Sequence, residues 1–585
     1  MAHLHTASED GGIKSRDKFL KTVQLGLLLT AALGFGAWAA AEPVAVDGGY
    51  LQGVVADGVR VYKGIPFAAP PVGLLRWRAP QAPPSWPGIR AADRFSAVCP
   101  QLGSYPPESA PETTSEDCLY LNIWTPLEAA AKPLPVMVWI YGGALQNGSA
   151  STPLYAGDGF ARRGVVLVTI NYRLGVLGFL ALNSLSKESV AGVSGNYGLL
   201  DQIAALQWVQ RNIGAFGGDP QRVTIFGQSS GSISVSALVA SPLAKGLFER
   251  AIGESGGLFE PLDLSAGFSL AGAEDSGRQF AQRQGVSTLA QLRARSVSDL
   301  LSTPFDAHFV VDGYVLKESP FDAYQRHAQN DVDVLVGSNA DEGQLFLQKK
   351  SVTVANFKDV LDADFPAPLV WLLHPNPGKT DSEARSATAA IEGDMRFRWD
   401  MWRWARLAAE DGKKRVYFYE FARTPPFPSG NRYYGLGATH GMEMPYVFDH
   451  LDQQEVPWAA KDRELASVLP EYWANFAKNG DPNGPGLPLW PSFRESPEKV
   501  MIFGEELRAE AIPGERNLRR IDRIYTTARF VSRHPYLVLG LGIFLVGAIL
   551  VMLSVMGYRS WARRRRQHFN SPPPRNRPGG AGLPA

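Results

Sequence analysis

A serine inside the pentapeptide Gly-x-Ser-x-Gly is the first side chain of this sequence with the type and setting for covalent chemistry. Ser229 is at the centre of residues 227–231, after a short run of strand-forming residues, 222–226, and before a segment of small residues, 232–240. Strand, glycine-flanked serine and helix form a nucleophile elbow, in which a strained turn exposes the hydroxyl and the helix N-terminus stabilises negative charge. We therefore predict that Ser229 is the nucleophile of an acyl-transfer reaction.

The same pentapeptide occurs a second time, around Ser255. It spans residues 253–257 and is followed by Leu-Phe-Glu-Pro at 258–261. That sequence does not start a helix with its N-terminus under the serine, so the third part of an elbow is missing. Ser229 is therefore preferred as the nucleophile, and Ser255 is the alternative.

Acyl transfer also needs hydrogen-bond donors for the oxyanion that forms on the attacked carbonyl. The apolar run 135–140 ends in Tyr-Gly-Gly-Ala at 141–144, where little side chain obstructs the backbone N–H groups. We expect the N–H groups of Gly143 and Ala144, together with that of Ser230, to form an oxyanion hole. A plain glycine turn is the alternative.

The elements that must position these groups are visible in the hydrophobic pattern. The runs 135–140, 222–226 and 332–336 are predicted to be buried strands, and residues 201–216 have apolar side chains at helical spacing before Gly217. Each segment with candidate chemistry therefore follows a predicted strand.

Three longer motifs are residues 116–126, residues 171–179, and residues 216–218 leading into the Ser229 elbow. Together they resemble the type-B carboxylesterase/cholinesterase family. The resemblance extends from about Val46 to Phe503. It implies an α/β-hydrolase fold, which is an α/β architecture with a large, mixed, mostly parallel sheet flanked by helices.

The family's chain order of serine, acid and histidine supplies two further catalytic candidates. The family pattern assigns the acid of Asp341-Glu342-Gly343 to Glu342 and not to Asp341. His440, within residues 437–446, resembles the family's catalytic histidine, and His450 is the alternative. The resemblance implies that His440 accepts the serine proton, that Glu342 orients the imidazole, and that no metal or organic cofactor is needed.

Three departures limit what can be carried over from the family, and the sequence resembles a bacterial-type carboxylesterase and not a cholinesterase. Ala144 replaces a third glycine, Gln228 replaces the usual Glu before the nucleophile, and residues 101–117 contain no Trp. The change at Gln228 removes a negative charge beside the serine and weakens the case for a cationic substrate. Ser255 resembles a family serine that supports the catalytic residues.

The chain has two cysteines, Cys99 and Cys118, 19 positions apart in a region that we expect to be exported. A disulfide that closes a short loop is predicted, with two free buried thiols as the alternative. No metal site is predicted there, because no histidine lies between or near the two cysteines.

Both ends of the chain have the features of targeting segments. Basic residues precede an apolar run, 23–37, and small residues, 39–41, which is the order of a secretory signal. An uncleaved anchor helix is the alternative.

Residues 535–558 contain no charged side chain and are long enough to cross a bilayer, with a buried core helix as the alternative. The predicted divisions are a signal peptide (1–41), a carboxylesterase domain (42–510), a basic linker (511–534), a transmembrane helix (535–558) and an Arg/Pro-rich cytoplasmic tail (559–585).

Composition and charge limit the function further. The 585 residues are 45% hydrophobic and 20% charged, as in an ordinary globular protein. Residues 557–585 contain seven Arg and no acid, and residues 1–41 carry a net charge of +1. Residues 42–556 therefore have a net charge of −7 and no electrostatic reason to bind nucleic acid.

We predict a serine carboxylic ester hydrolase in the inner membrane, with its catalytic domain outside the cytoplasm and a small-molecule ester as substrate. A catalytically silent adhesion or scaffold protein is the alternative, and no protein partner is identified.

Overall fold

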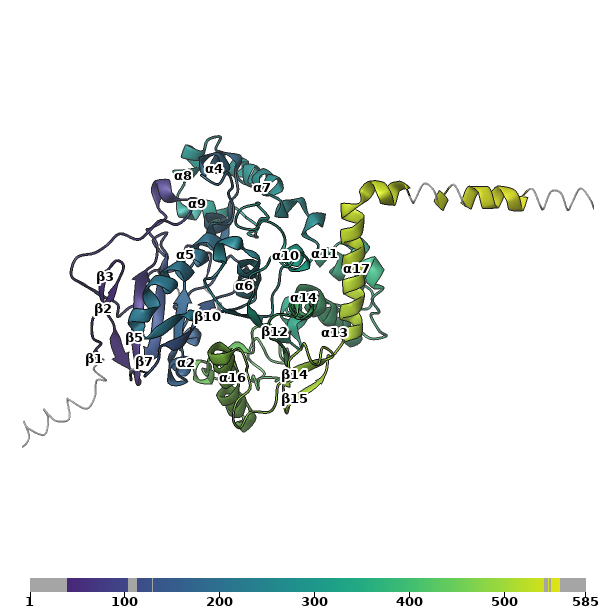
Figure 1. Cartoon of the computed structure of the whole chain (residues 1–585). Helices are drawn as coiled ribbons and strands as arrows, with labels where there is room; N and C mark the ends of the chain where they lie inside the picture. The colour runs from purple at the N-terminus through teal and green to yellow at the C-terminus, as the bar shows by residue number, and fades with distance from the viewer. Residues whose placement is uncertain (1–38, 104–112, 129, 541–544, 547–548, 558–585) are drawn as a thin grey trace, which may run out of the picture. The chain divides into compact units, whose positions relative to one another are not determined.

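The computed structural model describes residues 39–103, 113–128, 130–540, 545–546 and 549–557 (Figure 1). The chain divides into two compact units, Met1–Asp522 and Arg523–Ala585. Every candidate site residue lies in the first unit. The linker expected at 511–534 contains helix α17 (Glu515–Arg533), within which the first unit ends.

A mixed sheet is the centre of the first unit, and its middle strands are parallel. Seven adjacent strands, from β9 to β14 in spatial order, run parallel, whereas the strands at either edge pair antiparallel. In spatial order the strands are β1 (Ala39–Ala40), β4 (Val54–Ala56), β5 (Val59–Pro66), β7 (Tyr120–Pro126), β9 (Val166–Ile170), β8 (Leu134–Ile140), β10 (Gly218–Gln228), β11 (Arg250–Glu254), β12 (Asp333–Asn339), β13 (Val416–Phe421), β14 (Lys499–Phe503) and β15 (Leu507–Ala511). A small second sheet contains β2 (Val44–Val46), β3 (Gly49–Gln52) and β6 (Ile89–Ala91).

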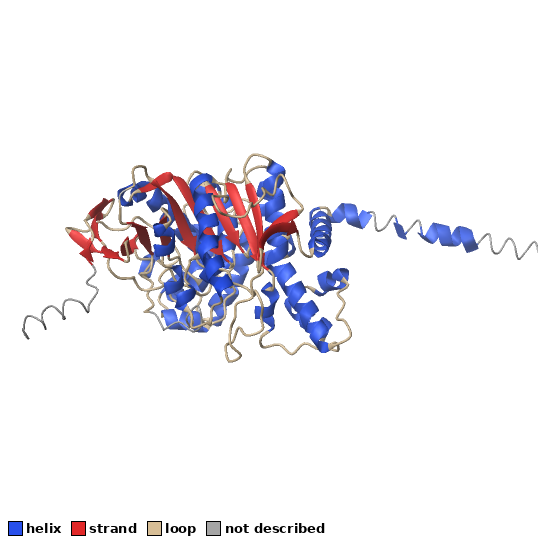
Figure 2. Cartoon of the chain, turned by 90° about the horizontal axis from the view of Figure 1, so that it is seen from below, coloured by secondary structure: helices blue, strands red, loops and turns tan. Residues whose placement is uncertain are grey.

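The central strands are almost continuous runs of apolar residues because helices and loops cover them. All five residues of β9 and all seven of β12 are buried, as expected for parallel strands with no solvent-facing side. The helices that pack against the strands (Figure 2) are α2 (Asp158–Arg162), α5 (Tyr197–Asn212), α6 (Ser230–Ala240), α14 (Trp399–Asp411) and α16 (Ala460–Asn479). The unit also contains α3 (Gly175–Phe179), α4 (Asn183–Glu188), α7 (Leu270–Arg283), α8 (Leu289–Arg293), α9 (Val297–Ser302), α10 (Pro320–Gln325), α11 (Phe357–Asp364), α12 (Ala367–Leu373), α13 (Asp381–Gly393) and α15 (Met444–Val447). The predicted α/β-hydrolase architecture is confirmed.

The three predicted strands are present as β8, β10 and β12, and all three are longer than the sequence indicated, β8 by one residue. Strand β10 begins at Gly218, and β12 continues to Asn339. The helix expected over 201–216 begins at Tyr197 and ends at Asn212, followed by one 3₁₀ turn. Gly217 ends this segment in the left-handed conformation, with φ 83°.

The predicted disulfide between Cys99 and Cys118 is formed. The predicted signal peptide lies outside the described residues up to position 38, and Ala39 and Ala40 form a short strand with β4. Among the residues that the structure describes, no helix is both long and apolar enough to cross a membrane. The span predicted at 535–558 includes residues 541–544, 547–548 and 558, which lie outside the described part, so it stays a prediction.

Candidate active site

Ser229 lies in a sharp turn between the end of β10 and the start of α6. Its backbone has φ 57° and ψ −127°, a region that non-glycine residues rarely occupy, and its N–H donates to the carbonyl oxygen of Glu254 at 2.8 Å. A Cβ placed on Gly231 would lie 2.0 Å from the carbonyl oxygen of Ile140. Only glycine fits at position 231, and its lack of a side chain lets the end of β8 pack directly against the turn. Ser229, in that turn, is half-buried.

The structure brings Glu342 and His440 together. Glu342 begins a 3₁₀ turn, η7 (Glu342–Leu347), directly after β12, and its Oε2 lies 2.6 Å from His440 Nδ1. Its other oxygen, Oε1, accepts the N–H of Asn339 at 2.7 Å. The neighbouring acid, Asp341, accepts the N–H of Ala438 instead, at 2.9 Å. Glu342 is thus the carboxylate on the imidazole, and Asp341 fixes the loop before it.

The other ring nitrogen of His440 is directed toward the elbow. His440 Nε2 lies 3.3 Å from the amide nitrogen of Gln228, the residue before Ser229. Because that amide nitrogen donates, the contact requires an unprotonated Nε2 and leaves the ring proton on Nδ1, against Glu342. This tautomer is the one in which a histidine can accept a proton from a serine.

The glycine turn after β8 meets the elbow from the other side. A Cβ placed on Gly142 would lie 2.9 Å from the Ser229 Cβ, and the N–H of Leu145 donates to the Ser230 hydroxyl at 3.2 Å. Gly143 and Ala144 both have positive φ, 115° and 56°. Within the described part of the chain, the N–H groups of Gly143, Ala144 and Ser230 have no acceptor. These three donors are therefore available to a ligand beside Ser229.

The second pentapeptide serine is in a different position. Ser255 is fully buried, and its hydroxyl donates to Glu342 Oε1 at 2.5 Å. Its N–H donates to the carbonyl oxygen of Gly337 at 2.9 Å. Ser255 therefore supports the carboxylate and is not open to a substrate carbonyl.

His450, the alternative histidine, lies in another environment. Its Nδ1 is 2.9 Å from the Leu154 carbonyl oxygen, and its Nε2 is 3.0 Å from Asp158 Oδ1. Both partners are acceptors, so both ring nitrogens must carry hydrogen. Burial works to lower the pKa of His450, but the hydrogen bonds to Asp158 and Leu154 and the nearby carboxylate charges together outweigh it, and the pKa is raised. A ring held in its charged form is a poor general base.

The model of the family described as "Carboxylesterase family" matches residues 40–520, most of the chain. The chain belongs to the carboxylesterase family. The match includes all the site residues above, and the resemblance inferred from the shorter motifs is confirmed.

Curated carboxylesterases resemble the chain over most of their length. Fumonisin B1 esterase of Sphingopyxis macrogoltabida is 40% identical over 78% of this chain and 86% of its own. Para-nitrobenzyl esterase of Bacillus subtilis (strain 168) is 36% identical over 80% and 95%, and human cocaine esterase is 34% identical over 83% and 91%. Carboxylesterase activity follows from this relationship.

Two buried acids that the sequence did not indicate lie beside the candidate site of this carboxylesterase. Glu443 accepts the Asn339 side-chain amide at 2.5 Å, and burial together with the charge of Glu342 raises its pKa to about 7. Burial and the charge of Glu443 raise the pKa of Glu254 well above its usual value. Glu443 follows His440 by three positions, but the pattern gave no sign that its side chain points inward.

Aromatic rings that the sequence did not indicate border His440. Phe397 lies parallel to the imidazole, with ring centroids 4.2 Å apart and planes 17° apart. Phe346, in η7, lies 5.9 Å from the same ring. Phe397 comes from a helix more than 40 positions before His440, so no local spacing joins the two residues.

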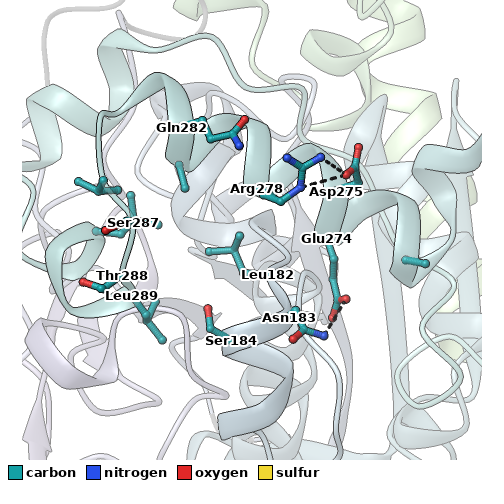
Figure 3. Close-up of a pocket in the computed structure, with 14 residues that line it drawn as sticks. Leu182, Asn183, Ser184, Glu274, Asp275, Arg278, Gln282, Ser287, Thr288 and Leu289 are labelled. Atoms are coloured by element: carbon teal, nitrogen blue, oxygen red, sulfur yellow. Dashed lines mark hydrogen bonds and ion pairs between the residues drawn. The ribbon is translucent and has the colours of Figure 1, made fainter.

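A cavity of about 590 Å³ lies between α4, α7 and α8 (Figure 3). Its charged lining is already paired, since Arg278 contacts Asp275 at 2.5 Å and Asn183 contacts Glu274 at 3.5 Å. None of the candidate site residues lines it, so we do not assign it to catalysis. Across the described residues, no group of three or more His, Cys, Asp or Glu is placed to hold a metal ion.

Proposed function

We propose that the protein hydrolyses carboxylic esters through Ser229, His440 and Glu342, with an acyl-serine intermediate. The observation that carries the proposal is the 2.6 Å contact of Glu342 with His440 Nδ1, because it leaves Nε2 unprotonated and directed toward the elbow. A serine hydroxyl is a weak nucleophile until an adjacent base removes its proton.

In the acylation step, Ser229 Oγ forms a bond with the ester carbonyl carbon while its proton passes to His440 Nε2. Glu342 faces the proton on Nδ1 and stabilises the charged imidazolium that results. The carbonyl oxygen becomes an oxyanion, and the N–H groups of Gly143, Ala144 and Ser230 are the proposed donors to it. The bond to the alcohol oxygen then breaks, and His440 returns the proton to the departing alcohol.

In the second step, water replaces the alcohol. His440 accepts a proton from water as the water oxygen attacks the acyl carbon, and the same donors hold the second oxyanion. The bond to Ser229 Oγ breaks, and the proton on His440 returns to the serine. A carboxylic acid leaves and the enzyme is regenerated.

We propose supporting roles for two more residues. Ser255 shares Oε1 of Glu342 with the Asn339 N–H, so it helps to fix the carboxylate that orients the imidazole. Gln228 donates to the resting Nε2 and adds no charge beside the nucleophile. The relatives are named for chemically unlike esters, so we propose the ester class alone as substrate.

We also propose that the enzyme is exported and tethered to the inner membrane. The charge-free stretch 535–558 and the seven Arg of 557–585 support this topology, as does the basic-then-apolar order of the N-terminal 41 residues. The catalytic domain would then act on esters outside the cytoplasm.

Hydrolysis of p-nitrophenyl acetate and p-nitrophenyl butyrate by the full chain tests the proposed chemistry. Ser229→Ala should lower kcat by at least about 10³-fold, because the nucleophile is lost. Ser255→Ala is the matched control, the same substitution in the same pentapeptide, and should retain activity within about 10-fold. Undiminished turnover in Ser229→Ala would refute the assignment, and a folded wild type without turnover would favour the scaffold function.

A further inference from the structure

One long helical segment near the candidate site has an irregular turn. Helices α13 and α14 are joined without a break by a π-helix, Asp394–Arg398. A π-helical turn inserts one extra residue into an α-helix and occurs frequently at functional sites. Since each residue of an α-helix advances by about 100°, the insertion changes which side chains face the sheet.

The π-helix directs Phe397 onto the imidazole of His440. The two rings are stacked, 4.2 Å between centroids and 17° between planes, and Phe397 is 7% exposed. Phe346 lies 5.7 Å from Phe397 and 5.9 Å from His440, so two aromatic rings border the imidazole. The contact is therefore with the face of the ring, whereas Glu342 contacts its edge.

Arginines on both sides of Phe397 hold the π-helix in place. Arg398 pairs with Asp394 at 2.7 Å and with Glu420 on β13 at 2.9 Å. Arg396 pairs with Glu392 at 2.7 Å, and its guanidinium lies 4.9 Å from the Phe346 ring centroid. These bonds tie the turn to α13, to the sheet and to η7, which limits movement of the residue between them.

The same helical segment also packs against the carboxylate end of the site. A Cβ placed on Gly343 would lie 2.0 Å from the carbonyl oxygen of Ala389 in α13, and one placed on Gly393 would lie 3.2 Å from the Glu342 Cβ. Close packing at both glycines fixes α13 relative to Glu342. The same helical segment thus carries Phe397 and packs against Glu342, two of the groups that contact His440.

We propose that Phe397 is a positioning residue for His440, and this inference rests on the proposed role of His440 as general base. Glu342 and Gln228 contact the two nitrogens at the edge of the imidazole, and neither contact covers a face of the ring to oppose its rotation. A flat ring on its face opposes that rotation and keeps Nε2 directed toward Gln228 and the elbow. The aromatic face is also attractive to the imidazolium that forms during acylation.

The test compares kcat and KM for p-nitrophenyl butyrate in Phe397→Leu, Phe397→Tyr and Phe280→Leu, all in the full chain. Phe280, in α7, is fully buried and has a ring contact with Phe305, so it controls for loss of a buried aromatic ring away from the site. Phe397→Leu should lower kcat about 10-fold with KM unchanged within about 3-fold, because geometry and not binding is lost. Phe397→Tyr, which keeps the flat ring, should restore kcat to within about 2-fold of wild type.

Three results would overturn the inference. They are a kcat of Phe397→Leu equal to that of Phe280→Leu, a change confined to KM, and a Tyr variant no better than the Leu variant. If Phe397→Leu does not fold, Phe397→Met provides the same comparison with a side chain closer in length. His440→Gln separates this inference from the proposed function. If His440→Gln keeps activity, the role of His440 as general base is wrong. If it is inactive, that role stands, and the kcat values of the Phe397 variants alone decide whether Phe397 positions the ring.

Discussion

At the scale of single residues, two serines share the same pentapeptide and nearly the same backbone angle, φ 57° at Ser229 and 54° at Ser255. Their surroundings separate them. Ser229 precedes a helix and is half-buried, whereas the Ser255 hydroxyl is bonded to Glu342 in the interior. The helix that follows, and not the pentapeptide, distinguishes a nucleophile from a supporting residue.

Glu342→Gln should lower kcat by about 10³- to 10⁴-fold, because an amide no longer selects the imidazole tautomer with its proton on Nδ1. Ser255→Ala should lower kcat much less, since the Asn339 N–H still donates to the same carboxylate oxygen. Steady-state kinetics on p-nitrophenyl butyrate measures both variants. Equal losses in the two variants would contradict the separate roles given to Glu342 and Ser255.

His450→Gln should keep activity and show a pH-dependent loss of stability. The pKa of His450 in the folded protein is raised above its pKa of about 6.5 in the unfolded chain. Its ion pair with Asp158 therefore stabilises the protein fully at pH values below the unfolded-state pKa. This stabilisation is lost as the pH rises through the folded-state pKa. Asp158 stays ionised throughout, since the hydrogen bond from His450 and the neighbouring charges, working against burial, lower its pKa to about 2. We expect His450→Gln to lower the free energy of unfolding by about 1 kcal/mol at pH 5.5, and by less at pH 9.

Urea unfolding at the two pH values measures this difference, with wild type as the reference at each. A loss of esterase activity comparable to that of His440→Gln would instead show that the wrong histidine was assigned to the reaction.

At the scale of elements, the site depends on close contacts between β8, the β10–α6 elbow and η7. Gly231→Ala should lower the free energy of unfolding by at least about 2 kcal/mol, because its Cβ would meet the Ile140 carbonyl at 2.0 Å. Gly214→Ala is the matched control, because a Cβ there meets nothing within 4 Å. Its effect should stay within about 1 kcal/mol. A Gly231→Ala protein as stable as Gly214→Ala would contradict the packing described for the elbow.

Local sequence predicted those elements whose residues carry their own signal. The strand 135–140 and the Ser229 elbow were located correctly, as were the segments of Glu342 and His440. The helix predicted over 201–216 starts four residues earlier, at Tyr197. Gly198 disfavours a helix by its local propensity, but its close packing against the Arg173 carbonyl and Phe179 places it inside the first turn. The π-helix and its Phe397 could not be predicted, since tertiary packing with η7 and β13 decides them.

At the scale of the whole molecule, charge and hydrophobicity are distributed unevenly along the chain. The chain has a net charge of +1. Residues 42–556 are negatively charged overall, and residues 557–585 are rich in Arg. We expect the full chain to stay in the membrane pellet after alkaline carbonate extraction, and a chain ending at residue 534 to appear in the supernatant. Immunoblotting of the fractions measures this, with the disulfide Cys99–Cys118 as a check that both chains reached an oxidising compartment. Identical behaviour of the two chains would contradict the tether.

The central claim is that Ser229 carries the acyl group. A fluorophosphonate probe reacts covalently with an activated serine, and mass spectrometry of the digested full chain locates the adduct. We predict a single adduct on Ser229, absent from Ser229→Ala and strongly slowed in His440→Gln. An adduct on Ser255, or an active preparation that takes up no probe, would contradict the account.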